Sequence, residues 1–231
     1  MNTVQQLLGL SSPPIDIAFL NAPPAGVEKW EGAVPAGCAF WRQAMNGKCF
    51  YTTTADHYNC AVGSHTHSIP LPASRAAELE QTVGFMVENN YIRLEEVPGI
   101  PTLAKSPTAV AYGPAGQTLF APDVIVAAAT PAQAMLLYEA AIRAGAGNAL
   151  ANIIGRPGCA SLPLALQSGT ATLSFGCKGN RTFTGLTGSE MYFVLPARYW
   201  TRLAAELDAV VAANATMQRH YESKSAQFPI L

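Results

Sequence analysis

Apolar residues recur at helical spacing along several stretches of the chain. In one of them Leu79, Val83 and Met86 fall at i, i+4 and i+7, so they share one face of a helix. A proline in the first turn favours helix starts at Pro131 and at Pro196. The predicted helices are residues 3–8, 38–45, 73–90 and 148–154, a helix that begins at Pro131, and a helix from Pro196 to about Ser223. Residues 57–62 are predicted to form a single helical turn.

Short apolar and β-branched runs, bounded by turn residues, predict strands between these helices. Residues 17–20 are all apolar, which is typical of a buried strand. The predicted strands are residues 16–20, 49–54, 108–112, 118–121, 123–128, 170–175 and 191–195, with loops at 63–72 and 176–181. This mixture predicts an α+β fold, with mixed or antiparallel sheets and flanking helices.

Two stretches of the chain resemble each other. The triplet Gly-Cys-Ala at 37–39 recurs at 158–160, and each copy is followed by a β-rich run and a second cysteine, Cys60 or Cys177. Short matches also arise by chance in a chain rich in alanine and glycine, so both explanations stay open.

A true duplication would give the chain two similar halves within one domain. It would make Cys38 and Cys159 equivalent and would place a site at the junction of the halves. The ranges implied are a single domain of residues 1–231 with pseudo-symmetric halves at about 15–70 and 123–185.

Composition narrows the class of protein. The chain has 231 residues, 49% of them hydrophobic, which is enough for one sizeable core. Only 13% are charged and the net charge is −1, so we expect no nucleic-acid or membrane partner. No apolar run approaches the ~20 residues of a membrane span. The first 20 residues lack the Lys or Arg of a secretory signal, so we expect a cytoplasmic protein.

Ligand-type side chains are concentrated in residues 37–71, which hold three of the five cysteines and three of the four histidines. An odd cysteine count without a secretory signal favours free thiols or ligands over disulfides. Thiolate and imidazole select zinc, copper and iron–sulfur clusters. In an extended segment, His65 and His67 would point to the same side.

These residues predict a metal or iron–sulfur centre with a redox or small-molecule role. There is no Cys-x-x-Cys, so zinc-ribbon and bacterial ferredoxin patterns are absent, and the cofactor stays open between an iron–sulfur cluster and zinc. The candidate ligands are Cys38, Cys60, His65, His67, Cys159 and Cys177.

Two alternatives remain open. Cys38 and Cys159 each open a predicted helix, where the thiolate is favoured, so one alternative is a cysteine-dependent enzyme with His57, His65 or His67 as its base. The other is a non-catalytic protein that binds a small molecule or forms a homodimer, with its cysteines as small core residues. The sequence does not decide whether the protein is an enzyme.

The segment from Gly176 to Arg181 is a candidate anion site. Its glycines allow a nest of backbone N–H groups, and Lys178 and Arg181 add positive charge suited to a carboxylate or phosphate. A solvated turn is the other interpretation.

Four segments of the chain carry a family resemblance. They are residues 38–44, 50–53, 56–63 and 177–181. Together they resemble the uncharacterised domain-of-unknown-function family 169 of archaea and of anaerobic or facultative bacteria. The resemblance implies a single full-length domain and points to the scattered cysteines and to the late Cys177-x-Gly179-x-Arg181 segment. It implies no particular reaction.

Overall fold

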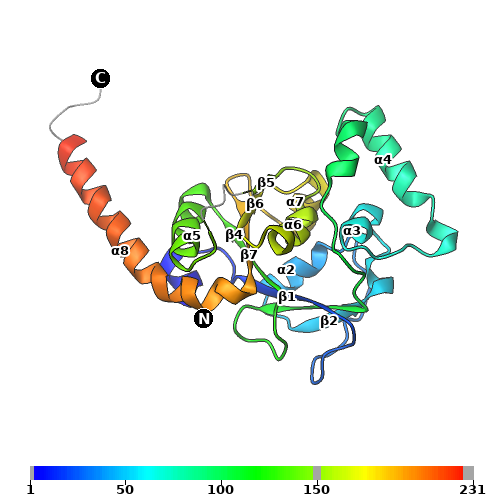
Figure 1. The fold of residues 1–231 in the computed structure, drawn as a ribbon, viewed down its shortest axis with the longest axis horizontal. Helices are drawn as coiled ribbons and strands as arrows, with labels where there is room; N and C mark the ends of the chain where they lie inside the picture. The colour runs from blue at the N-terminus through cyan, green and yellow to red at the C-terminus, as the bar shows by residue number, and fades with distance from the viewer. Residues whose placement is uncertain (1–2, 148–151, 226–231) are drawn as a thin grey trace.

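The computed structural model describes residues 3–147 and 152–225, which are built around one open β-sheet (Figure 1). Its strands are β1 (Ile15–Leu20), β2 (Phe50–Thr53), β3 (Ala109–Pro114), β4 (Val124–Ala129), β5 (Asn152–Ile154), β6 (Thr172–Ser174) and β7 (Met191–Pro196). Their order is β2-β3-β1-β4-β7-β6-β5. Neighbouring strands are antiparallel except β5 and β6, which are parallel. The predicted α+β fold with a mixed sheet is confirmed.

Helices cover both faces of the sheet. They are α1 (Thr3–Leu8), α2 (Ala39–Met45), α3 (Ala61–Thr66), α4 (Glu78–Glu88), α5 (Pro131–Arg143), α6 (Ser161–Ser168), α7 (Lys178–Thr184) and α8 (Trp200–Ser225). One face, with Ala127 and Phe193, packs against α1, α5 and α8. The other face, with Val126 and Val194, packs against α2 and α6. Because both faces are covered, β3, β4 and β7 are buried along their whole length, which explains their continuous apolar runs.

The sheet has the same arrangement on either side of its centre. The middle strands β1 and β4 pair around Asp16 and Ile125. Reading outward, β3 and then β2 follow β1, just as β7 and then β6 follow β4, and each pair is antiparallel. A twofold axis between β1 and β4 relates the strand pairs on the two sides. Under this axis the pair Ile15–Pro114 corresponds to Val124–Pro196, and the pair Phe50–Tyr112 corresponds to Thr172–Val194.

Several local predictions are wrong. The predicted loop 63–72 contains the end of α3, the predicted loop 176–181 contains the start of α7, and residues 118–121 are not a strand. The two missed helices begin after cysteine caps, Cys60 and Cys177, and cysteine is not a residue that marks a helix start in sequence. The predicted turn at 57–62 is instead a 3-10 turn, Thr54–His57, followed by α3.

Two predicted helices have different bounds. The helix predicted over 73–90 begins as a 3-10 turn, Ala73–Arg75, and α4 proper starts only at Glu78. Of the helix predicted over 148–154, residues 148–151 lie outside the described residues, and Asn152–Ile154 form strand β5. No helix in the described part of the chain has both the length and the apolar character needed to cross a bilayer.

Candidate functional site

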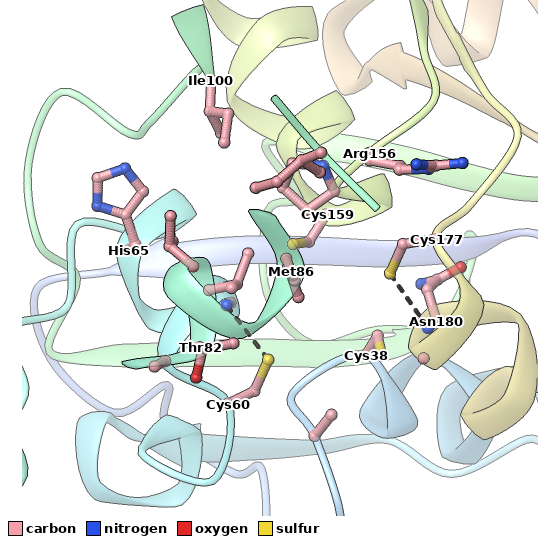
Figure 2. Close-up of a pocket in the computed structure, with 18 of the residues that line it drawn as sticks. Cys38, Cys60, His65, Thr82, Met86, Ile100, Arg156, Cys159, Cys177 and Asn180 are labelled. Carbon is pink, nitrogen blue, oxygen red and sulfur yellow. Dashed lines mark hydrogen bonds between the residues drawn. The ribbon is translucent and has the colours of Figure 1, made fainter. Parts of the chain in front are cut away.

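A cavity of about 980 Å³ opens on the α2 and α6 side of the sheet, and four of the five cysteines line it. They come from four separate segments of the chain, and their sulfur atoms point toward a common space (Figure 2). All four are free thiols and half-buried. The four are Cys38, Cys60, Cys159 and Cys177.

Local hydrogen bonds orient three of these sulfur atoms. The Sγ of Cys60 caps α3 and accepts the N–H of Gly63 at 3.3 Å. The Sγ of Cys177 caps α7 and accepts the N–H of Asn180, also at 3.3 Å. In the same way, the hydroxyl of Thr66 donates to the Sγ of Cys159 at 3.3 Å. N–H and O–H donors of this kind favour a thiolate over a thiol.

The four cysteines occupy matching places in the two halves of the sheet. Cys38 directly precedes α2, and Cys159 lies in the 3-10 turn Gly158–Ala160 that leads into α6. Cys60 caps the helix that follows edge-side strand β2, and Cys177 caps the helix that follows β6. Each half of the sheet therefore supplies two thiols to the cavity.

Glycines allow the cysteine segments to approach closely. A Cβ added to Gly158 would lie 3.0 Å from the Cα of Gly176, so the backbones that carry Cys159 and Cys177 are in contact. A Cβ added to Gly37 would lie 2.9 Å from the Nδ1 of His57. Both distances are tighter than nearly all real Cβ contacts, so a side chain at either glycine would force its neighbour to shift.

A model of the family DUF169, described as "Uncharacterised ArCR", matches residues 3–206. The chain belongs to the DUF169 family. No curated protein and no solved structure matches the chain. The match confirms the resemblance seen in the sequence, and it brings no reaction with it. The chemistry of this DUF169 protein has to be argued from its own side chains.

Burial raises the pKa of three of the DUF169 thiols. It raises the pKa of Cys38 to about 12, and the neighbouring thiols of Cys177 and Cys60 add to the rise, while the Asn180 side chain offsets part of it. Burial likewise raises the pKa of Cys60 and Cys159. Because the thiols raise one another's pKa, ionising several of them together requires a compensating positive charge.

The histidines are not placed as bases for these thiols. The Thr52 hydroxyl donates to the carbonyl of Val110, so its oxygen accepts the Nε2–H of His57 at 2.8 Å. His67 is buried, and neither of its ring nitrogens has a hydrogen-bond partner among the described residues. The premise that His65 and His67 lie on one side of an extended segment is wrong, because His65 is in helix α3 and His67 caps it.

Lowering the pH from 7.5 to 5 is expected to destabilise the protein through His57 and His67. Burial lowers the pKa of His57 to about 4 and, with the charge of His57, that of His67 to about 3. The histidines of the unfolded chain have a pKa near 6.5, so between about pH 6.5 and the folded pKa values the unfolded chain binds more protons than the folded protein. Over that window the free energy of unfolding therefore decreases as the pH is lowered. The free energy of unfolding should drop by about 2 kcal/mol for each histidine.

Urea titrations at the two pH values measure this drop. A His67→Asn variant should lose about half of the pH dependence, whereas His220→Asn, in the exposed part of α8, should leave it unchanged. Equal pH dependence in all three proteins would contradict the assignment.

Of the two cationic side chains in the candidate anion site, Arg181 is held by contacts within its own loop, whereas Lys178 is exposed. Arg181 donates its guanidinium N–H groups to the backbone carbonyls of Phe175, Thr187 and Glu190, so it closes a loop of its own chain. Lys178 is exposed at the cavity, and within residues 3–147 and 152–225 it forms no ion pair. Anion binding by Lys178 stays a prediction.

The structure also adds residues that the sequence did not single out. Asn180 is buried in the cavity wall beside the cysteines, and the apolar face of α4 lines the cavity instead of the core. The sequence places Asn180 only within the candidate anion-binding segment 176–181. Across the described part of the chain, no group of three or more His, Cys, Asp or Glu side chains is placed to hold a metal ion.

Proposed function

We propose that this protein binds a thiolate-ligated metal centre of the iron–sulfur class through Cys38, Cys60, Cys159 and Cys177. The observation that carries the proposal is the convergence of these four thiols, from four segments, on one space in a cavity (Figure 2). Thiolates are the ligands of iron–sulfur clusters, and four cysteines are the usual number for one cluster.

We propose a cluster and not a single ion. As the side chains stand, no group of three or more ligand-type side chains of the described residues is placed to hold a metal ion. The four thiols nevertheless line one cavity, and those of Cys60 and Cys177 are near enough to Cys38 to raise its pKa. A cluster of several irons is wider than one zinc ion, so it suits thiols that surround a space without touching. Four thiolates repel one another, and the positive charge of the metal would offset that repulsion.

The surroundings of the sulfur atoms support the same function. Three of the four already accept a hydrogen bond at 3.3 Å, from Gly63, Thr66 and Asn180. Hydrogen bonds to cysteine sulfur stabilise thiolate ligands and tune the reduction potential of clusters. A Cys–His catalytic pair has no such support, since His57 is bonded to Thr52 and no described histidine is bonded to a cysteine.

The proposal includes the duplication of the chain. The matching sheet registers and the matching places of the cysteines support two repeats, each of which supplies two ligands. In this arrangement the cluster lies near the pseudo-twofold axis that relates the halves. In this proposal the first half extends beyond the expected 15–70 to include β3, which ends at Pro114, and the second extends beyond 123–185 to include β7, which ends at Pro196.

Replacing any one of the four cysteines with serine is expected to lower the iron content of the protein at least several-fold. The measurement is anaerobic purification followed by iron and acid-labile sulfide analysis and a visible spectrum of the same sample. Equivalent cysteines should behave alike, so Cys60→Ser and Cys177→Ser should show similar losses.

Cys49→Ser is the matched control. Cys49 is the fifth cysteine, and it packs beside Gly113 and a separate apolar cluster instead of lining the cavity. Wild-type iron in Cys49→Ser with losses in the other four supports the centre. Zinc without colour, lost in the same four variants, would reject the cluster in favour of a zinc site. Wild-type metal content in Cys60→Ser would reject both.

A further inference from the structure

The apolar face of α4 is only partly covered by protein and lines the cavity. None of the residues of α4 is buried, although Leu79, Val83 and Met86 form the apolar stripe that predicted the helix. All three line the cavity, and α4 packs against α3 at the edge of the molecule (Figure 1). Apolar surface left in water costs about 25 cal/mol per Å², so an apolar occupant of the cavity would be favoured.

More apolar side chains surround the same cavity. Phe85 of α4 is 66% exposed, Ile153 of β5 is 57% exposed and Phe183 of α7 is 37% exposed, and each of them lines the cavity. Large apolar side chains exposed together around a hollow are typical of a ligand site. They come from three separate elements, so the fold, not one local segment, produces this rim.

Two buried polar side chains in the cavity wall have few or no partners. His67 is 3% exposed and neither of its ring nitrogens has a hydrogen-bond partner among the described residues, while Asn180 is 2% exposed and its side chain interacts with the thiol of Cys38. A buried polar group without a partner costs about 1–3 kcal/mol. An occupant with a hydrogen-bonding group would recover part of this cost, and Asn180 lies beside the cysteines (Figure 2).

The charges at the cavity favour an uncharged occupant. The two carboxylates that line it are already paired, Glu78 with Arg75 at 2.5 Å and Glu96 with Arg93 at 3.2 Å. The two cationic side chains that line it, Lys178 and Arg156, are exposed to solvent, and the guanidinium of Arg156 lies 4.1 Å from the centroid of the Tyr91 ring. The cavity therefore offers apolar walls and neutral hydrogen-bonding groups in its interior.

We propose that the cavity binds an uncharged organic molecule, with an apolar body against α4 and a carbonyl or hydroxyl group at Asn180. A volume of about 980 Å³ lies at the upper end of the range for small-molecule sites. If the bound molecule is the substrate of the metal centre, this inference rests on the proposed function. The binding step itself requires only the cavity, so the two can fail separately.

The test uses the fluorescent probe 6-propionyl-2-dimethylaminonaphthalene, which is apolar and uncharged. Its emission moves to shorter wavelength when its carbonyl group loses a hydrogen bond. The wild-type protein should bind it saturably. Met86→Trp, which fills the cavity, should weaken binding at least tenfold. The matched control is Met135→Trp, because Met135 is 56% exposed on α5 and does not line the cavity.

Two further variants locate the probe and separate the proposals. In Asn180→Ala, the emission of the bound probe should move to shorter wavelength, and an unchanged emission would overturn the placement at Asn180. Cys60→Ser should lose its metal but still bind the probe. Wild-type metal content without saturable probe binding, or equal weakening by Met86→Trp and Met135→Trp, would overturn the cavity assignment and leave the metal centre standing.

Discussion

Replacing Phe40 with alanine is expected to lower the free energy of unfolding by about 3–5 kcal/mol. Phe40 is fully buried in α2, and its ring contacts four others. The centroid distances are 5.8 Å to Trp30, 5.9 Å to Phe50, 5.4 Å to His57 and 5.6 Å to Tyr112. Truncation would leave a cavity among these rings, and since β2 and β3 hold Phe50 and Tyr112 in place, we expect the site to collapse only partly.

Urea denaturation of wild type and variant measures this loss. Phe85→Ala is the control, because Phe85 is 66% exposed on α4, and its replacement should change stability by no more than about 0.5 kcal/mol. Phe40→Leu should fall between the two, since it keeps most of the buried volume. A loss below about 1 kcal/mol in Phe40→Ala would show that α2 does not anchor this face of the sheet.

The sheet was largely predictable because its signal is local. Residues 16–20, 123–128 and 191–195 are short apolar runs between turn residues, and they form β1, β4 and β7. The helix from Pro131 was predictable for a similar reason, since Thr130 caps it and Gln133 completes a capping box. Signals of this kind are contained within a few residues, and no distant contact is needed to produce them.

The site was less predictable because it depends on contacts between distant segments. The sequence identified the cysteines, but only the undecided duplication suggested that Cys38 and Cys159 should meet, since 120 intervening positions separate them. The small helices at Cys60 and Cys177 depend on thiol caps, for which no strong sequence preference exists. The stripe on α4 was identified correctly as apolar, but the pattern alone cannot distinguish a cavity wall from a core.

The repeat in the sequence acquires a physical meaning in the sheet. The triplets at 37–39 and 158–160 are short enough to arise by chance. Sheet registers are independent of those triplets, and a slip by one residue in any strand would turn its side chains to the other face. The matching strand order, directions and strand ends on the two sides of β1 and β4 are what two related halves would produce, so the duplication stays a prediction that the sheet supports.

Replacing Gly158 with valine is expected to separate the two cysteine segments of the second half. Even a Cβ at this position would lie 3.0 Å from the Cα of Gly176 and 3.4 Å from the backbone nitrogen of Cys177. Valine adds two methyl groups to that contact, and backbone cannot rotate away as a side chain can. Overpacking of this kind costs about 1–3 kcal/mol in the free energy of unfolding. The shift should also move Cys159 away from Cys177 and lower the metal content at least several-fold.

Gly155→Val provides the comparison that gives this prediction its force. Gly155 lies in the same loop, is exposed, and a Cβ there would meet no atom within 4 Å. The same substitution three residues earlier should therefore leave both urea stability and metal content near wild type. If Gly158→Val lost stability but kept its metal, the contact between the two backbones would serve the fold alone, and the ligands would tolerate displacement of Cys159. If both variants behaved like wild type, the close approach of the two loops would not be required for either. Loss of metal in Gly158→Val alone would show that the glycine contact positions the thiols, because every cysteine is still present in that variant.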